Sequence, residues 1–203
     1  MQDSGRIAVL ISGRGSHLKN LIQCCARDQI PAQIAVVVSN NAEAPGLQYA
    51  RQAGIESFVL SHKELPVREE YDARIVETLR ARNVDLVCLA GFMRLLSGVF
   101  VRAFSMRIMN VHPALLPAFP GLHAQRQAIE HGVKVTGVTV HFVDEGLDSG
   151  PIILQRTVEV RNDDTEESLS ERLLPIEHQT YAEAVRLFFE NRLKVQGRKV
   201  MIL

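Results

Sequence analysis

The stretch RIAVLISGRGSHLKNLI, residues 6–22, decides the fold of this chain. Its segment IAVLI is a continuous apolar run, which is typical of a strand buried on both faces. The segment SGRGSH then places two glycines in a turn, and LKNLI continues with helical spacing. A strand, a glycine turn and a helix in this order are typical of an α/β protein.

The same alternation of strand and helix continues through the first half of the chain. Further strands are predicted for QIAVVVS (33–39), ESFVL (56–60) and VDLVCLAG (84–91), with helices at about 16–27, 44–53 and 66–82. Near-continuous apolar strands favour a mostly parallel twisted sheet with helices on both faces. Ligands bind at the carboxyl ends of the strands in such sheets, so the loops that follow these strands are candidate binding segments.

After residue 91 the pattern changes, and antiparallel strands are expected in the C-terminal half. MRIMNVH predicts a strand, residues 123–131 a helix, and RLKVQGRKVMIL a closing hairpin. VTGVTVHFVD and PIILQRTVEV alternate with period two, as a half-buried antiparallel pair does. We therefore expect one domain with two halves, residues 1–104 and residues 105–203.

One long helix is predicted near the C-terminus, from about Asp164 to Glu190. Asp164 is the candidate N-cap, because Glu167 follows three residues later as in a capping box. Pro175 falls inside this segment and is expected to kink or break the helix.

Bulk composition excludes several classes of protein. The 203 residues hold 23 Lys and Arg against 23 Asp and Glu, so bulk charge supports neither nucleic-acid nor membrane-surface binding. The opening MQDSGR lacks the basic and apolar blocks of a signal peptide, and no apolar run approaches membrane-spanning length. Three cysteines make no disulfide framework. A cytoplasmic protein is expected.

The glycine turn is a candidate anion site. Gly13 and Gly15 let backbone N–H groups and the following helix N-terminus converge on one point. The third glycine of a dinucleotide motif is absent, and the second strand ends in Ser39-Asn40-Asn41, without an acid for a ribose hydroxyl. The turn therefore favours a single phosphate monoester over a nicotinamide cofactor, with a tight turn that binds nothing as the alternative.

A second candidate group lies in MNVHPALLP. Asn110 and His112 are two residues apart in an extended segment, so their side chains point the same way. An amide donor beside an imidazole suits a tetrahedral intermediate, which needs an oxyanion donor and a proton-transfer group. The alternative is that both residues cap loop backbone at the end of a strand.

The acidic loop DEGLDSGP supplies a third candidate, Asp148. Asp148 is either a turn residue or, if it approaches His112, a carboxylate that favours the protonated imidazole. A metal site is not expected, because His112, His123 and His141 lack a tight ligand spacing.

Four segments together resemble the folate-dependent formyltransferase family over nearly the whole chain. They are LISGRGSHLKNLI, LAGFMRLLS, MNVHPALLPAFPGLHAQRQAI and VTGVTVHFVDEGLDSGPIILQ. The resemblance implies a Rossmann-like formyltransferase fold. It also implies transfer of the formyl group of 10-formyltetrahydrofolate, a co-substrate, to the amine of glycinamide ribonucleotide in purine biosynthesis, without a metal. It makes residues 1–104 the mononucleotide- and phosphate-binding half and residues 105–203 the catalytic and folate-binding half. It further suggests a cis peptide at Leu116-Pro117 and a monomer or homodimer.

The resemblance also implies roles for individual residues. Asn110 would stabilise the oxyanion, His112 would transfer a proton, and Asp148 would hold His112. The residues implied to bind glycinamide ribonucleotide are Gly13, Gly15, Ser16, His17, Leu174 and Glu177. The residues implied to contact the folate are Arg68, Met93, Arg94, Leu95, Leu96, Asn110, Val143, Asp144 and Glu145, with the loop continuing to Asp148.

Two positions depart from the family pattern, which usually has Asn where His17 stands and no proline at position 175. Among relatives, a formyltetrahydrofolate hydrolase carries a preceding regulatory domain and methionyl-tRNA formyltransferase an extra C-terminal domain, so a chain of this length is expected to be neither. A non-catalytic mononucleotide-binding module remains the alternative of a different class.

Overall fold

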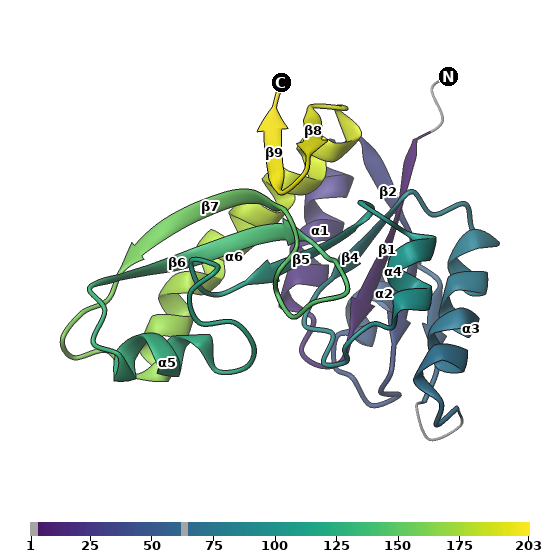
Figure 1. Ribbon diagram of the computed structural model, residues 1–203. Helices are drawn as coiled ribbons and strands as arrows, with labels where there is room; N and C mark the ends of the chain where they lie inside the picture. Colours follow the sequence, from purple (N-terminus) through teal and green to yellow (C-terminus); the bar gives the residue numbers. More distant parts are fainter. Residues whose placement is uncertain (1–3, 62–64) are drawn as a thin grey trace. The chain divides into compact units, whose positions relative to one another are not determined.

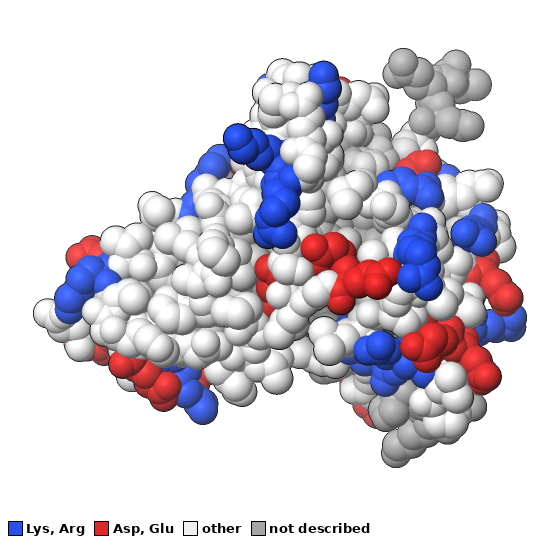
Figure 2. Space-filling model, in the orientation of Figure 1, with Lys and Arg blue, Asp and Glu red and all other residues white. Residues whose placement is uncertain are grey.

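The computed structural model describes residues 4–61 and 65–203 and divides the chain into two compact units between Met109 and Asn110. The described residues form six helices and nine strands (Figure 1). No helix in these ranges is long and apolar enough to cross a membrane. On the face drawn in Figure 2, basic and acidic side chains are interspersed, in keeping with the balanced composition.

The first unit contains a parallel sheet. Its strands follow the order β3 (Ser57–Val59), β2 (Ala32–Ser39), β1 (Gly5–Ile11) and β4 (Leu86–Leu89). All three pairings are parallel, and the apolar run of β1 is fully buried. The helices are α1 (Ser16–Ala26), α2 (Leu47–Gln52), α3 (Arg68–Arg80) and α4 (Gly98–Ala103). The parallel βα arrangement predicted from the apolar runs is confirmed.

The chain enters the second unit along β5 (Ile108–His112). The elements that follow are α5 (Ala124–Glu130), β6 (Val135–Phe142), β7 (Ile152–Glu159), α6 (Glu166–Phe189), β8 (Leu193–Gln196) and β9 (Lys199–Ile202). Strands β6 and β7 pair antiparallel, as do β8 and β9, whereas β7 pairs parallel to β9. The predicted antiparallel strands and closing hairpin are confirmed.

Helix α6 covers β6 and β7, as Figure 1 shows. Its Leu169 and Leu173 are fully buried against Val138 of β6 and Val160, which follows β7. This core fixes β6, the strand that carries part of the candidate site, against the longest helix of the unit.

The predicted N-cap of the long helix was wrong by one residue. Thr165, not Asp164, is the N-cap: its side chain accepts a hydrogen bond from the Ser168 backbone at 3.1 Å, and Ser168 Oγ accepts one from the Thr165 backbone at 3.0 Å. Asp164 instead accepts hydrogen bonds from the Arg161 backbone and Ser168 Oγ. The extended backbone of Thr165 gives its hydroxyl the reach that a cap requires.

Of the two expectations for Pro175, a kink or a break in this helix, the break was wrong. Helix α6 runs without interruption for 24 residues with Pro175 inside it. A proline removes one backbone donor from a helix. Burial of Leu173 and Tyr181 on either side of Pro175 keeps both halves of the helix in the core and stabilises it as one element.

Helix α4 was not predicted. At six residues it is too short to show a helical period, and the core contacts of Phe100 and Val101 stabilise it. Helix α2 is likewise shorter than the predicted 44–53 segment and begins only at Leu47.

Candidate active site

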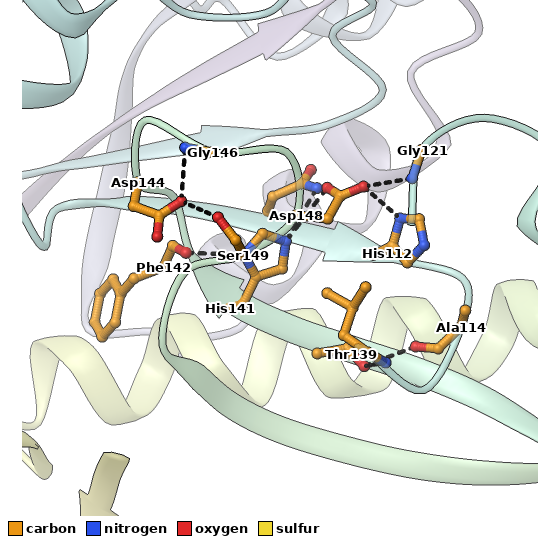
Figure 3. Close-up of polar contacts among 12 residues, drawn as sticks. His112, Ala114, Gly121, Thr139, His141, Phe142, Asp144, Gly146, Asp148 and Ser149 are labelled. Carbon is orange, nitrogen blue, oxygen red and sulfur yellow. Dashed lines mark hydrogen bonds and ion pairs between the residues drawn. The ribbon is translucent and has the colours of Figure 1, made fainter. Parts of the chain in front are cut away.

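Asn110, His112 and Asp148 lie together in the second unit. Strand β5 carries the first two residues, and Asp148 comes from the loop between β6 and β7. His112 Nδ1 lies 3.5 Å from Asp148 Oδ2 (Figure 3), and the imidazole is almost fully buried. His112 Nε2 lies 2.8 Å from the carbonyl oxygen of Phe119. Both ring nitrogens therefore face oxygen acceptors, and a doubly protonated ring can donate to both.

Asp148 occupies a constrained loop position. Its backbone has φ 48°, in the left-handed region. Its Oδ2 also accepts a hydrogen bond from the Gly121 backbone at 2.8 Å, so one carboxylate oxygen connects the β6–β7 loop to the segment that follows β5. The carboxylate is thus oriented by backbone as well as by His112.

Asp144 organises the same loop. Its Oδ1 accepts hydrogen bonds from the Gly146 backbone at 3.0 Å and from Ser149 Oγ at 2.6 Å (Figure 3). A Cβ at Gly150 would lie 1.9 Å from the carbonyl oxygen of Phe142, so the close return of the loop onto β6 requires glycine there. In the sequence LDSG, Gly150 is therefore required for steric reasons, whereas Asp148 and Ser149 supply polar groups.

Thr139 on β6 was missed by the sequence reasoning. Its hydroxyl donates to the Ala114 carbonyl at 2.7 Å and accepts from the Leu116 backbone at 3.0 Å. Gln155 Nε2 also donates to this hydroxyl and to the Leu116 carbonyl. These bonds hold the segment after β5, where the suggested cis peptide at Leu116-Pro117 is confirmed.

His141 on β6 is the second residue of the site that was missed, having been considered only as a metal ligand. Its Nε2 lies 3.4 Å from Asn110 Nδ2 and 3.7 Å from Asp148 Oδ1, and its Nδ1 lies 2.8 Å from the Phe142 carbonyl oxygen. Burial lowers the pKa of His141. Residues 139 and 141 are two apart in a predicted strand, so the sequence already indicated that their side chains share one face.

The glycine turn in the first unit has an open helix N-terminus. Gly15 is the N-cap of α1 with φ 72°, and a Cβ there would lie 2.6 Å from Gly46 Cα. The Gly46 backbone donates to the Gly13 carbonyl at 3.0 Å. No side chain caps α1 and no acidic residue occupies its first turn, where Ser16 and His17 stand. Such a terminus suits an anion.

The segment after β4 is bonded to this turn. Met93 N donates to Ser12 Oγ at 2.8 Å, and Ser12 N donates to the Gly91 carbonyl at 3.2 Å. Met93 and Leu95 leave 70% and 62% of their surfaces exposed. The Arg94 guanidinium stacks over the Tyr71 ring at 4.5 Å from its centroid.

The remaining candidate residues are distributed over both units. Arg68 begins α3 and is half-exposed, whereas Leu174 and the buried Glu177 lie on α6. Val143 and Glu145 follow β6 in the same loop as Asp144. The residues expected in catalysis are thus gathered in the second unit, and the residues expected to bind the phosphate are gathered in the first. Leu174 and Glu177, also expected to bind glycinamide ribonucleotide, lie in the second unit. No group of three or more His, Cys, Asp or Glu residues in 4–61 and 65–203 is placed to hold a metal ion.

Comparison with known proteins assigns the family. The family model described as formyl transferase matches residues 5–185. The chain therefore belongs to the formyl transferase family, and the resemblance read from its motifs is confirmed.

Two individual relatives match most of this chain. The chain is 43% identical over 189 residues to the phosphoribosylglycinamide formyltransferase of Escherichia coli, covering 93% of this chain and 89% of that protein. The glycinamide ribonucleotide transformylase 1 structure from Symbiobacterium toebii matches with a TM-score of 0.98 and 53% identity, covering 100% of this chain and 96% of that one. Both relatives match this chain over nearly its full length, and their names are those of the enzyme class expected from the motifs.

A longer relative contains a similar sequence as one part. The chain is 51% identical over 185 residues to the trifunctional purine biosynthetic protein adenosine-3 of Drosophila melanogaster. The match covers 90% of this chain but only 14% of that protein, so the chain spans about a seventh of its length.

Proposed function

We propose that this chain transfers the formyl group of 10-formyltetrahydrofolate to the primary amine of glycinamide ribonucleotide in purine biosynthesis. The observation that carries the proposal is the buried His112, 3.5 Å from Asp148 and two residues from Asn110 on the same strand. An amide donor, an imidazole and a carboxylate are the groups that acyl transfer through a tetrahedral intermediate needs.

The tetrahedral intermediate of this reaction forms and collapses at the formyl carbon. The amine attacks the formyl carbon, a C–N bond forms, and the carbonyl oxygen becomes an oxyanion. This oxyanion accepts a hydrogen bond from the Asn110 amide and is stabilised electrostatically by the charge of the protonated His112. Collapse breaks the C–N bond to the folate, and the proton lost by the amine passes to the departing folate nitrogen. Asp148 keeps His112 oriented and compensates its charge. Positioning and electrostatics account for this chemistry without a covalent enzyme intermediate.

We assign the phosphate of the ribonucleotide to the glycine turn. Gly13, Gly15, Ser16 and His17 surround the N-terminus of α1, whose first N–H groups are free of capping side chains. A phosphate monoester supplies the negative charge that a helix N-terminus favours. Leu174 and Glu177 are assigned to the glycinamide end of the substrate.

The folate is assigned to two segments and one arginine. The first segment, with Met93, Arg94, Leu95 and Leu96, exposes the apolar side chains of Met93 and Leu95, which can cover an aromatic ring. The second segment, with Val143, Asp144 and Glu145, offers backbone groups that can bind the ring. Arg68, with its side chain half-exposed, suits a carboxylate of the glutamate tail.

One assay tests the proposal against its rivals. The protein is mixed with 10-formyltetrahydrofolate and glycinamide ribonucleotide, and formylated product and free formate are both quantified by mass spectrometry. We expect stoichiometric formylated product. Formate release without that product would instead indicate a hydrolase, and ligand binding without turnover a mononucleotide-binding module. His112→Ala protein that still binds ligand is the matched control for catalysis.

A further inference from the structure

His141 lies beside the reacting groups but has no place in the mechanism above. It is 2% exposed and comes from β6, the strand that faces Asn110 of β5 through a long 3.4 Å contact. Figure 3 shows its ring on the opposite side of Asp148 from His112. The Asp148 carboxylate therefore lies between two imidazoles, with Oδ2 near one and Oδ1 near the other.

The hydrogen-bond partners of His141 define its tautomer. A backbone carbonyl only accepts hydrogen bonds, so Nδ1, 2.8 Å from the Phe142 carbonyl oxygen, carries the hydrogen. In the neutral ring Nε2 is then an acceptor. The group of Asn110 that faces this acceptor must be the amide nitrogen, because the amide oxygen would meet a lone pair.

The groups around His141 have opposing effects on its pKa. Asp148 and Asp144 favour the protonated ring, whereas burial, the largest influence, and the neighbouring His112 oppose it, and the net effect is a lowered pKa. A protonated His141 would turn Nε2–H toward Asn110, favour a flipped amide and compete with His112 for Asp148. The neutral ring avoids all three consequences.

We propose that His141 is a positioning residue whose neutral Nε2 fixes the orientation of the Asn110 amide so that its second N–H points to the oxyanion. The proposal rests on the proposed function, because it assigns Asn110 to the oxyanion. An amide NH2 has two hydrogens, so the bond to His141 leaves one for the reaction. A preoriented donor stabilises a transition state without the cost of reorganisation.

A pair of substitutions separates this role from simple packing. His141→Asn keeps a donor for the Phe142 carbonyl but lacks an acceptor at the Nε2 position, whereas His141→Gln can place its amide oxygen there. We expect His141→Asn to lower kcat about 10–100-fold with both KM values within about threefold, and His141→Gln to recover most of the loss. Wild-type kcat in His141→Asn, or equal losses in both variants, would overturn the proposal.

A double-substitution cycle gives a readout that a merely structural role would not produce. If His141 acts through Asn110, then His141→Asn has no further effect on kcat in an Asn110→Ala protein. Multiplication of the two losses would contradict action through Asn110.

The tautomer itself can be measured without turnover. Nitrogen-detected NMR of the full chain labelled with ¹⁵N-histidine is expected to show His141 neutral at pH 7, with hydrogen on Nδ1. Hydrogen on Nε2, or a charged ring, would overturn the proposal. If the wild-type protein failed to transfer formyl, the proposed function would be overturned instead. The measured tautomer would still show whether His141 Nε2 can accept a hydrogen bond from the Asn110 amide.

Discussion

The Oδ2 atom of Asp148 lies 3.5 Å from Nδ1 of His112, and the same oxygen accepts a hydrogen bond from the Gly121 backbone. This arrangement makes Asp148 both a charge partner for the imidazole and a tether between two loops.

Asp148→Asn is expected to lower kcat at least about a hundredfold, because the amide keeps the size of the side chain but removes the carboxylate that faces Nδ1 of His112. The measurement is steady-state formyl transfer, with circular dichroism to confirm folding. Asp163→Asn, an exposed aspartate beyond β7, is the control and should match the wild type. Near-normal turnover of folded Asp148→Asn protein would rule out this role.

Gly15→Ala is expected to raise KM for glycinamide ribonucleotide at least about tenfold, since the added Cβ would lie 2.6 Å from Gly46 Cα and displace the turn from the substrate phosphate. Gly54→Ala is the matched control. Its φ is +67°, close to the +72° of Gly15, but a Cβ there meets open space. An equal change of KM in both variants would show that backbone strain alone is responsible.

Thr139→Val is expected to lower the free energy of unfolding by about 2 kcal/mol, because the Leu116 N–H and the Gln155 amide lose a buried acceptor. Urea unfolding measures the change. Thr139→Ser keeps the hydroxyl and should retain most of the stability. If Thr139→Ser lost as much as Thr139→Val, packing of the methyl group rather than hydrogen bonding would explain the loss.

Cys25 is expected to react with iodoacetamide at pH 8 about a hundredfold more slowly than free cysteine, whose pKa is about 8.5. Burial, with a smaller contribution from Cys24, raises the pKa of Cys25 to about 11, so its thiol stays protonated until the pH approaches that value. Peptide mapping of alkylated protein gives the rate for each cysteine. A rate at pH 8 equal to that of free cysteine would contradict the raised pKa, and the rate should climb as the pH rises toward 11.

Much of the fold could be predicted from local pattern. The buried runs of β1, β2 and β4 are properties of a few adjacent residues, and the structure confirms these strands. Strands β6 and β7 pair antiparallel as predicted, but the expected half-buried alternation was wrong for β6, which is buried from Thr136 to Phe142. The spacing of Asn110 and His112 likewise placed two candidate side chains on one face of a strand before any contact was known.

The prediction of the long helix was wrong at two positions where residue type alone was a poor guide. Asp164 and Thr165 are both acceptable N-caps by residue type, and only the backbone geometry selects Thr165. Pro175 is unfavourable in an isolated helix, but buried neighbours on α6 outweigh it.

The sequence by itself determined the order of strands and helices, the glycine turn and the residue types available for catalysis, because periodicity and backbone preference act over short distances. Only the tertiary structure decided that Asp148 meets His112 rather than serving as an ordinary turn residue, and that His141 bonds Asn110. These contacts join β5, β6 and the loop after β6, which are far apart along the chain. Their partners are chosen by strand pairing and by the close return of the loop at Gly150, which no local pattern encodes.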